Sequence, residues 1–150
     1  MEAITDKLQR ESIELASLSR RALAFFIDDL IINVLFIVIY YPTLQPLFGD
    51  AQALINAISA LVVQLLALKV LYHTFFIWRF GASIGKMACK IICIDATMLC
   101  TPSIWQAFLR ACVRLLSEWC FYLGFAWAFG NSARQTWQDK LARTIVCDAK

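Results

Sequence analysis

The sequence predicts an all-α membrane protein with two transmembrane helices, a third apolar helical block and a small cytoplasmic strand pair. Of its 150 residues, 61% are hydrophobic and only 17% are charged, against roughly 25% charged residues in a soluble domain. The apolar residues also gather in three blocks, at 22–41, 54–78 and 103–129. One soluble core cannot hide this much apolar surface in a chain of this length. We therefore expect a single membrane domain over residues 1–150.

The first two blocks have the length of membrane spans. Residues 1–20 are polar and mixed in charge, and they predict a short surface helix before the first block. Residues 22–41 are just enough to cross a hydrocarbon core of about 30 Å, and Pro42 predicts the end of that helix. A loop at 42–53 without lysine or arginine follows. The block at 54–78 is longer, so we expect it to span with some tilt.

The segment at 79–102 changes character. Lys86 and Lys90 are four residues apart, which predicts a brief amphipathic helix at the membrane surface with its lysines toward water or lipid phosphate. The runs Ile91–Asp95 and Thr144–Asp148 both have the pattern of a short strand. If these two runs pair, both must lie on the same side of the membrane.

Basic residues predict the orientation, because short cytoplasmic segments are enriched in lysine and arginine. The N-terminal tail has four, the loop at 42–53 has none, and 79–102 has three, so we expect a cytoplasmic N-terminus. The tail at 130–150 also has four, which conflicts with a simple third crossing. Two alternatives stay open for 103–129: a re-entrant hairpin with its bend in 117–124, or a third span.

The composition argues against most kinds of catalytic site. His73 is the single histidine, and the six cysteines form no Cys-x-x-Cys pair, so we expect no catalytic triad, no metal site and no cofactor. Most cysteines stand in apolar runs, where a free thiol behaves as a small hydrophobic group. The stretch 81–86 lacks the spacing of a phosphate-binding loop. Basic residues are spread along the chain, which argues against nucleic acid as a partner. We therefore expect that the protein is not an enzyme.

Charged residues within the apolar blocks are the candidate site. A charge at the centre of a spanning helix costs roughly 2.5–3.5 kcal/mol on insertion scales. Asp28 lies about 10 Å along its helix from Arg21, and Lys69 about 15 Å from Arg79, so an acid of the first block is expected to meet Lys69. Two roles are open for these charges: they bind an ion or a proton, or they only pair with one another and fix the register of the helices. The candidate residues of this network are Arg21, Asp28, Asp29, Lys69, Arg110, Arg114 and Glu118.

Three motifs occur in order along the chain. Arg21 to Asp28 fits Arg-x-x-Ala-x-x-x-Asp, and 81–86 followed by Ile91–Asp95 fits Gly-Ala-Ser/Thr-x-Gly-Lys before a strand ending in Asp. Residues 134–146 fit Arg-Gln-Thr-x-His-Asp-Lys-x-Ala-x-Thr-x-Val, with one difference. Over residues 16–148 the chain resembles the RDD family of small bacterial membrane proteins.

The resemblance adds Asp139 to the candidate residues. It identifies Asp139 as the second aspartate of the family name, and we expect it to pair with Arg110 or Arg114 and so tie the tail to the third block. Gln138 stands where the family motif usually has histidine. Proton handling by that histidine therefore does not apply to this chain.

The resemblance also implies a location and two hypotheses for function. It implies that the chain is a multi-pass protein of the bacterial cytoplasmic membrane, and it implies for some family members an activity as cation/proton antiporters. In the first hypothesis Asp28 and Asp29 bind a monovalent cation or proton, Arg21 sets their charge state and Lys69 is the counter-ion. Such a small chain would then need to form a homo-oligomer or join another membrane protein. In the second, the chain is a non-transporting assembly or accessory protein whose charges are structural. The lipid bilayer is the partner common to both.

Overall fold

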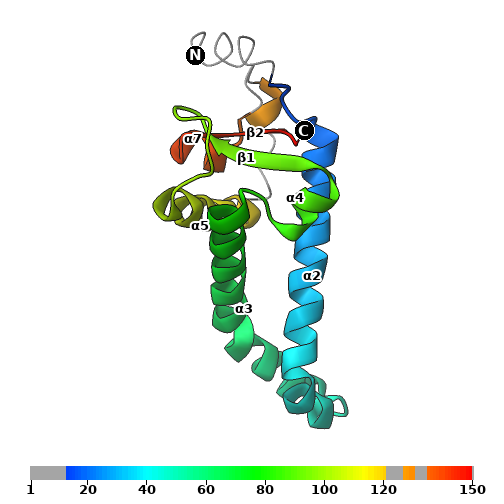
Figure 1. Cartoon of the computed structure of the whole chain (residues 1–150). Coiled ribbons are helices and arrows are strands. Elements are labelled where there is room, and N and C mark those ends of the chain that lie inside the picture. Colours follow the sequence, from blue (N-terminus) through cyan, green and yellow to red (C-terminus); the bar gives the residue numbers. More distant parts are fainter. Residues whose placement is uncertain (1–12, 121–126, 131–134, 150) are drawn as a thin grey trace.

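Two long helices extend from one compact end of the molecule. The computed structural model describes residues 13–120, 127–130 and 135–149. Helices α2 (Leu18–Leu44) and α3 (Ala51–Phe80) are joined by the short 3-10 helix η1 (Gln45–Leu47), and both descend from the compact end (Figure 1). They are the two helices in the described part of the chain that are long and apolar enough to cross a membrane. This confirms the two helices predicted at 22–41 and 54–78.

The ends of the two helices follow from their capping residues. Ser17 accepts a hydrogen bond from the Arg20 amide before α2, and Asp50 accepts two from the first turn of α3. Helix α3 ends at Gly81, whose φ of 70° is favourable for glycine. The predicted helix end at Pro42 was wrong, since α2 continues to Leu44. A proline this close to the end removes one backbone hydrogen bond from a helix of 27 residues.

The compact end, hereafter the cap, comprises the described residues from 81 onward. It contains α4 (Ile84–Ala88), β1 (Ile91–Asp95), α5 (Ile104–Trp119), the 3-10 helix η2 (Trp127–Gly130), α7 (Trp137–Leu141) and β2 (Thr144–Asp148). The two strands pair antiparallel with Ile91 opposite Asp148 and Asp95 opposite Thr144. Their buried side chains belong to two apolar clusters, one with the free cysteine Cys93 and Val146, the other with Ile145 and the free cysteine Cys147. The predicted strand pair is confirmed with its boundaries.

The chain before α2 also joins the cap. Leu15 forms an isolated bridge with Cys147, and the Ala16 amide donates to the Val146 carbonyl at 3.1 Å. Residues 13–17 are therefore not part of the surface helix expected over 1–20, because their backbone runs along β2 instead. Residues 1–12 lie outside the described part.

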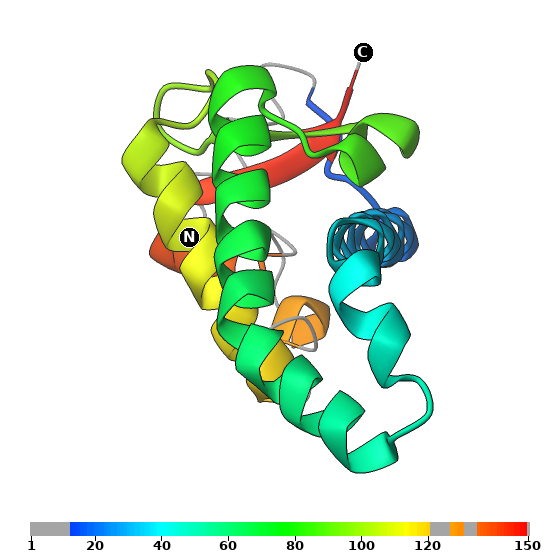
Figure 2. The ribbon, with the colours of Figure 1, turned by 90° about the horizontal axis from the view of Figure 1, so that it is seen from below.

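The strand pairing places the tail at the same end as the start of α2 and the end of α3 (Figure 1). A single third crossing would carry the tail to the opposite end. The observed position of the tail is the one expected for a re-entrant hairpin. Of the bend expected at 117–124, residues 121–124 lie outside the described part, and residues 117–119 still belong to α5. Helix α5 has 16 residues, about 24 Å, and lies across the direction of α2 (Figure 2).

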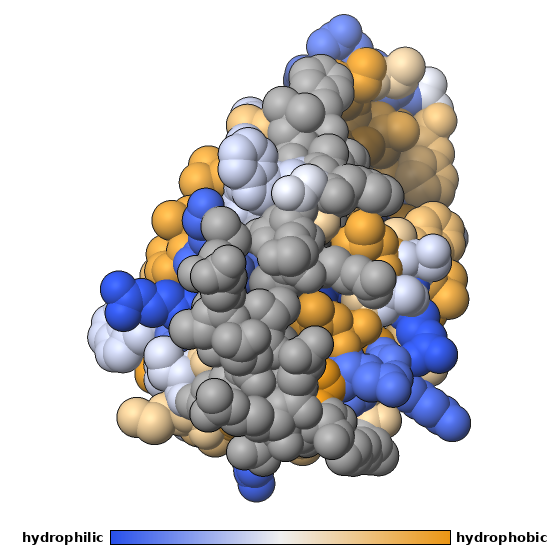
Figure 3. Space-filling view, turned by 90° about the horizontal axis from the view of Figure 1, so that it is seen from above, coloured by the Kyte–Doolittle hydropathy of each residue, from blue (hydrophilic) through white to orange (hydrophobic). Residues whose placement is uncertain are grey.

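The long helices expose their apolar side chains. Val38, Val63 and Leu71 are each at least 65% exposed, and in the most apolar stretch of α3 no residue is buried. Viewed from the cap end, hydrophilic side chains reach outward between apolar patches (Figure 3). An apolar surface of this extent requires lipid or another protein to cover it, which agrees with a membrane location for α2 and α3.

Candidate functional site

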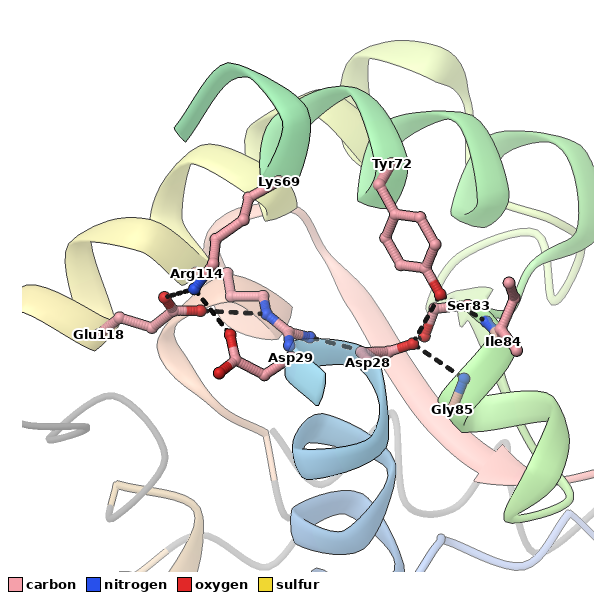
Figure 4. Close-up of polar contacts among 9 residues, drawn as sticks. All are labelled: Asp28, Asp29, Lys69, Tyr72, Ser83, Ile84, Gly85, Arg114 and Glu118. Carbon is pink, nitrogen blue, oxygen red and sulfur yellow. Dashed lines mark hydrogen bonds and ion pairs between the residues drawn. The ribbon is translucent and has the colours of Figure 1, made fainter. Parts of the chain in front are cut away.

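A lysine lies between two carboxylates where α2, α3 and α5 meet. The Lys69 Nζ is 2.7 Å from an Asp29 oxygen and 2.9 Å from a Glu118 oxygen (Figure 4). The side chains of Lys69 and Glu118 are each 13% exposed, whereas that of Asp29 is 33% exposed. Asn33, one turn after Asp29, donates to its second oxygen at 3.1 Å. The predicted meeting of an acid on the first helix with Lys69 is confirmed, and it involves Asp29.

Asp28 is completely buried and has several hydrogen-bond donors around it. It accepts hydrogen bonds from the Tyr72 hydroxyl at 2.9 Å, the Ser83 hydroxyl at 2.5 Å and the Gly85 amide at 2.8 Å. A guanidinium nitrogen of Arg114 is 3.9 Å away. These donors come from α3, α5 and the start of α4, so Asp28 connects three helices to α2. The sequence motif containing Ser83 and Gly85 was the signal for this contact, but its partner was not evident.

The close approach of α4 to α2 requires glycine at position 85. A Cβ atom added there would lie 2.2 Å from the Ala24 carbonyl oxygen and 2.9 Å from the Asp28 carboxylate. Real atoms do not approach so closely, so any larger residue would move α4 away and break the hydrogen bond from the Gly85 amide to Asp28.

Arg114 links Asp28 to the lysine. Its Nε is 3.5 Å from Glu118, one turn later on α5, and its guanidinium lies 4.0 Å from the centre of the Phe25 ring. Five charged side chains thus form one network, hereafter the Lys69 network: Asp28, Asp29, Lys69, Arg114 and Glu118. With every member ionised it carries three negative and two positive charges, which gives a formal charge of −1.

A second buried network attaches the tail. Asp139 is 2.5 Å from Arg110 and 3.3 Å from Arg21, and its side chain is 1% exposed. It also accepts from the Thr136 amide at 3.1 Å, which caps α7. Burial raises the pKa of Asp139, but the Arg110 and Arg21 charges outweigh this and hold it below its usual value. Arg21 also donates to the Val146 carbonyl of β2 at 2.7 Å.

These contacts correct one pairing and confirm another. Arg21 was expected to set the charge state of Asp28, but its guanidinium is turned toward β2 and pairs with Asp139, which the fold of the tail brings close. The predicted pair of Asp139 with Arg110 is confirmed. Arg114, the alternative partner, instead contacts Asp28 and Glu118.

The prediction for Lys86 was also wrong. Its side chain is half-buried, with no ion pair among the described residues, and it lines a small cavity with His73, Arg110, Arg114 and Gln138. The cavity of about 10 Å³ has room for about one water. Burial and the neighbouring Arg110 lower the pKa of Lys86 to about 8. His73 of α3 is also buried beside these cap residues. Lys90 is exposed as predicted.

The described residues hold no group of three or more His, Cys, Asp or Glu side chains arranged for a metal ion. The carboxylates of the Lys69 network already have basic partners. Its chemistry is therefore that of an ion-paired cluster between helices, in which a proton or a small cation changes the charge balance.

The model of the RDD family matches residues 15–143, most of the chain. The chain belongs to the RDD family. No curated protein and no solved structure matches it. The arginine and aspartates that the resemblance identified, Arg21, Asp28 and Asp139, all lie in the two buried networks. With its two long apolar helices, the chain is a membrane protein of this family.

Proposed function

We propose that this protein exchanges a monovalent cation for a proton across the bacterial cytoplasmic membrane, with its N-terminus and cap on the cytoplasmic side. The observation that carries the proposal is the Lys69 ammonium between the carboxylates of Asp29 and Glu118. Two carboxylates that converge on one positive charge already have the arrangement that a small cation needs, since such ions prefer oxygen ligands.

The charge of the Lys69 network supports exchange with one proton. Its formal charge of −1 is costly in surroundings of low polarity. Either one proton on a carboxylate or one bound monovalent cation makes the network neutral. Arg110 lies one turn before Arg114 on α5, but it is paired with Asp139 and is therefore not counted in the Lys69 network. Lys86 lines the small cavity together with Arg114, and no ion pair joins it to the network among the described residues.

Asp29 is the carboxylate best placed to exchange its proton. It is the most exposed acid of the network, and Lys69 holds it beside Glu118. Asp28 instead has its oxygens occupied by Tyr72, Ser83 and Gly85, which suits a role in holding the helices together. The proposal thus moves the exchange site from Asp28 and Asp29 to Asp29 and Glu118.

Two spanning helices cannot enclose a pathway, so the proposal includes an oligomer. The apolar faces of α2 and α3 that are exposed in the single chain are available for contact with other copies. Each copy would contribute its own Lys69 network beside the shared path.

Purified protein in liposomes with a trapped pH-sensitive dye tests this proposal. Adding Na⁺, Li⁺ or K⁺ outside should move protons, and Asp29→Asn and Glu118→Gln should each reduce the flux at least tenfold. Asp50→Asn is the matched control, because Asp50 is an exposed carboxylate that caps α3 far from the network. Equal flux in Asp29→Asn and Asp50→Asn, or no flux in folded wild-type protein, would exclude the exchange site.

A membrane accessory protein is the second candidate function. It is favoured by the complete pairing of Asp28 and by the absence of buried residues in the most apolar stretch of α3. In that case the networks fix the cap on the helices, and the exposed faces bind another membrane protein. The wild-type protein would then show no cation-dependent proton flux in liposomes. Asp29→Asn would lower the unfolding temperature of the protein in the same liposomes.

A further inference from the structure

Helix α3 carries an exposed amide in the middle of its length. Gln64 lies about 21 Å along the helix from Asp50 and about 22 Å from Arg79, the charged residues at its two ends. A hydrocarbon core of about 30 Å extends about 15 Å to either side of its midplane, so Gln64 lies deep within it. The side chain of Gln64 is nevertheless exposed in the single chain.

The Gln64 amide has no hydrogen-bond partner in another element of the described structure. In the orientation that suits its surroundings, its nitrogen donates to the Ala60 and Leu61 carbonyls of its own helix, at 2.9 and 3.2 Å, and its oxygen accepts from no other described residue. Lipid tails offer no hydrogen bond, so an amide oxygen at this depth is costly until another protein group donates to it. In membrane proteins, glutamine side chains form such hydrogen bonds between packed helices.

The residues around Gln64 form an exposed side of α3, hereafter the Gln64 face. It contains, at intervals of four, three and four residues, Ala60, Gln64, Ala67 and Leu71, and all four are exposed. Such intervals place residues on one side of a helix. Lys69 follows Ala67 by two residues, about 200° around the helix, so the Lys69 network lies on the opposite side. The Gln64 face therefore has small and apolar side chains, one amide and no charge.

The chemistry of the Gln64 face fits a second copy of the same face. A carboxamide is both donor and acceptor, so two Gln64 side chains related by a two-fold axis each donate to the oxygen of the other. A face without charge needs no opposite charge on its partner, and intervals of three and four residues are those of a left-handed helix pair. The alanines on either side of Gln64 let two backbones approach closely enough for the amides to meet.

We propose that two copies of this chain pair through the Gln64 face, with both caps at the same membrane surface and the two Gln64 carboxamides hydrogen-bonded across a two-fold axis. The pairing gives a partner to an amide that otherwise faces lipid. It goes beyond ion exchange and holds equally for an accessory protein, because Gln64 is not part of the Lys69 network. That network lies outside the contact and stays open on the side of α2.

Energy transfer between labelled copies tests the pairing. Intact chains that carry a donor or an acceptor fluorophore at the N-terminus are mixed in liposomes and diluted stepwise with lipid. The folded wild type should keep its energy transfer on dilution, and Gln64→Leu should weaken association about tenfold, because it removes both hydrogen bonds between the copies. Gln52→Leu is the matched control, since Gln52 is an exposed glutamine in the first turn of the same helix. Folded wild-type chains without energy transfer, or equal association in the two variants, would contradict the proposed pair.

Added bulk tests the position of the contact. Ala60→Leu should push the two backbones apart beside Gln64 and weaken association several-fold. Ser59→Leu should not, because Ser59 is exposed on another side of α3. Equal association in Ala60→Leu and Ser59→Leu would show that the copies do not meet at the Gln64 face.

Proton flux in the same liposomes separates this inference from the proposed function. Energy transfer that Gln64→Leu weakens, without cation-dependent proton flux in the wild type, would support the pair and exclude ion exchange. Cation-dependent flux in chains that show no energy transfer would exclude the pair and leave ion exchange standing.

Discussion

The attachment of the tail rests on one carboxylate shared by two arginines, so Asp139→Asn should release it. The substitution keeps the shape of the side chain and an oxygen for the Thr136 amide, but it removes the charge opposite Arg21 and Arg110. The side chains of Asp139, Arg21 and Arg110 are 1%, 6% and 4% exposed, respectively. Breaking a buried ion pair costs about 3–5 kcal/mol. We expect the lower end, about 3 kcal/mol, because Val146 and Thr144 still accept from the two arginines.

The assay combines unfolding in detergent with thiol labelling. Cys147 of β2 is 1% exposed, so it should react only when the tail detaches, and Asp139→Asn should accelerate its labelling roughly 100-fold at 3 kcal/mol. The matched control is Asp148→Asn, which removes a surface ion pair with Arg20 worth less than about 1 kcal/mol. Similar labelling rates in the two variants would refute the reasoning.

Three further predictions concern the cap. Lys86→Met should raise the unfolding temperature at pH 7, since it removes a half-buried ammonium without an ion pair among the described residues. The wild type should become more stable as pH rises from about 8 toward 10.5, because the folded form releases its proton first, and the variant should lose this rise in thermal scans. Burial raises the pKa of Asp95, but hydrogen bonds from the following turn and α5 lower it to about 2. Urea unfolding should therefore show stability falling by about 2 kcal/mol between pH 5 and pH 2, and not in Asp95→Asn. Gly85→Ala should cost about 1–3 kcal/mol in the same assay, because its Cβ meets the Ala24 carbonyl; unchanged stability would show that α4 does not pack on α2.

The spans and strands were predictable because local patterns decide them. Predominantly apolar blocks of twenty or more residues favour a helix in lipid. Ile91–Asp95 and Thr144–Asp148 are short apolar runs that end in aspartate, and such runs are consistent with buried strands. Helical rise alone also placed Lys69 near the acids of α2. The length of a helix and the position of a residue along it follow directly from the order of residues in the sequence.

The partners within the networks were less predictable because they depend on how the cap folds. Whether Arg21 pairs with Asp28 or with Asp139 depends on the path of the tail, because Asp139 follows Arg21 by 118 residues in the sequence. Lys86 was expected to face water or lipid phosphate because of its four-residue spacing from Lys90, but α4 has only five residues and ends before Lys90. Its direction follows from the contact of Gly85 with α2, a tertiary contact that no local period indicates.

The central claim is that the Lys69 network is neutral with either one proton or one monovalent cation. The most direct measurement adds Na⁺, Li⁺ or K⁺ to weakly buffered protein in detergent and records the protons released. The account predicts release approaching one proton per chain, retained in Asp50→Asn and lost in Asp29→Asn. No release from folded wild-type protein, or the same release from Asp29→Asn, would contradict it.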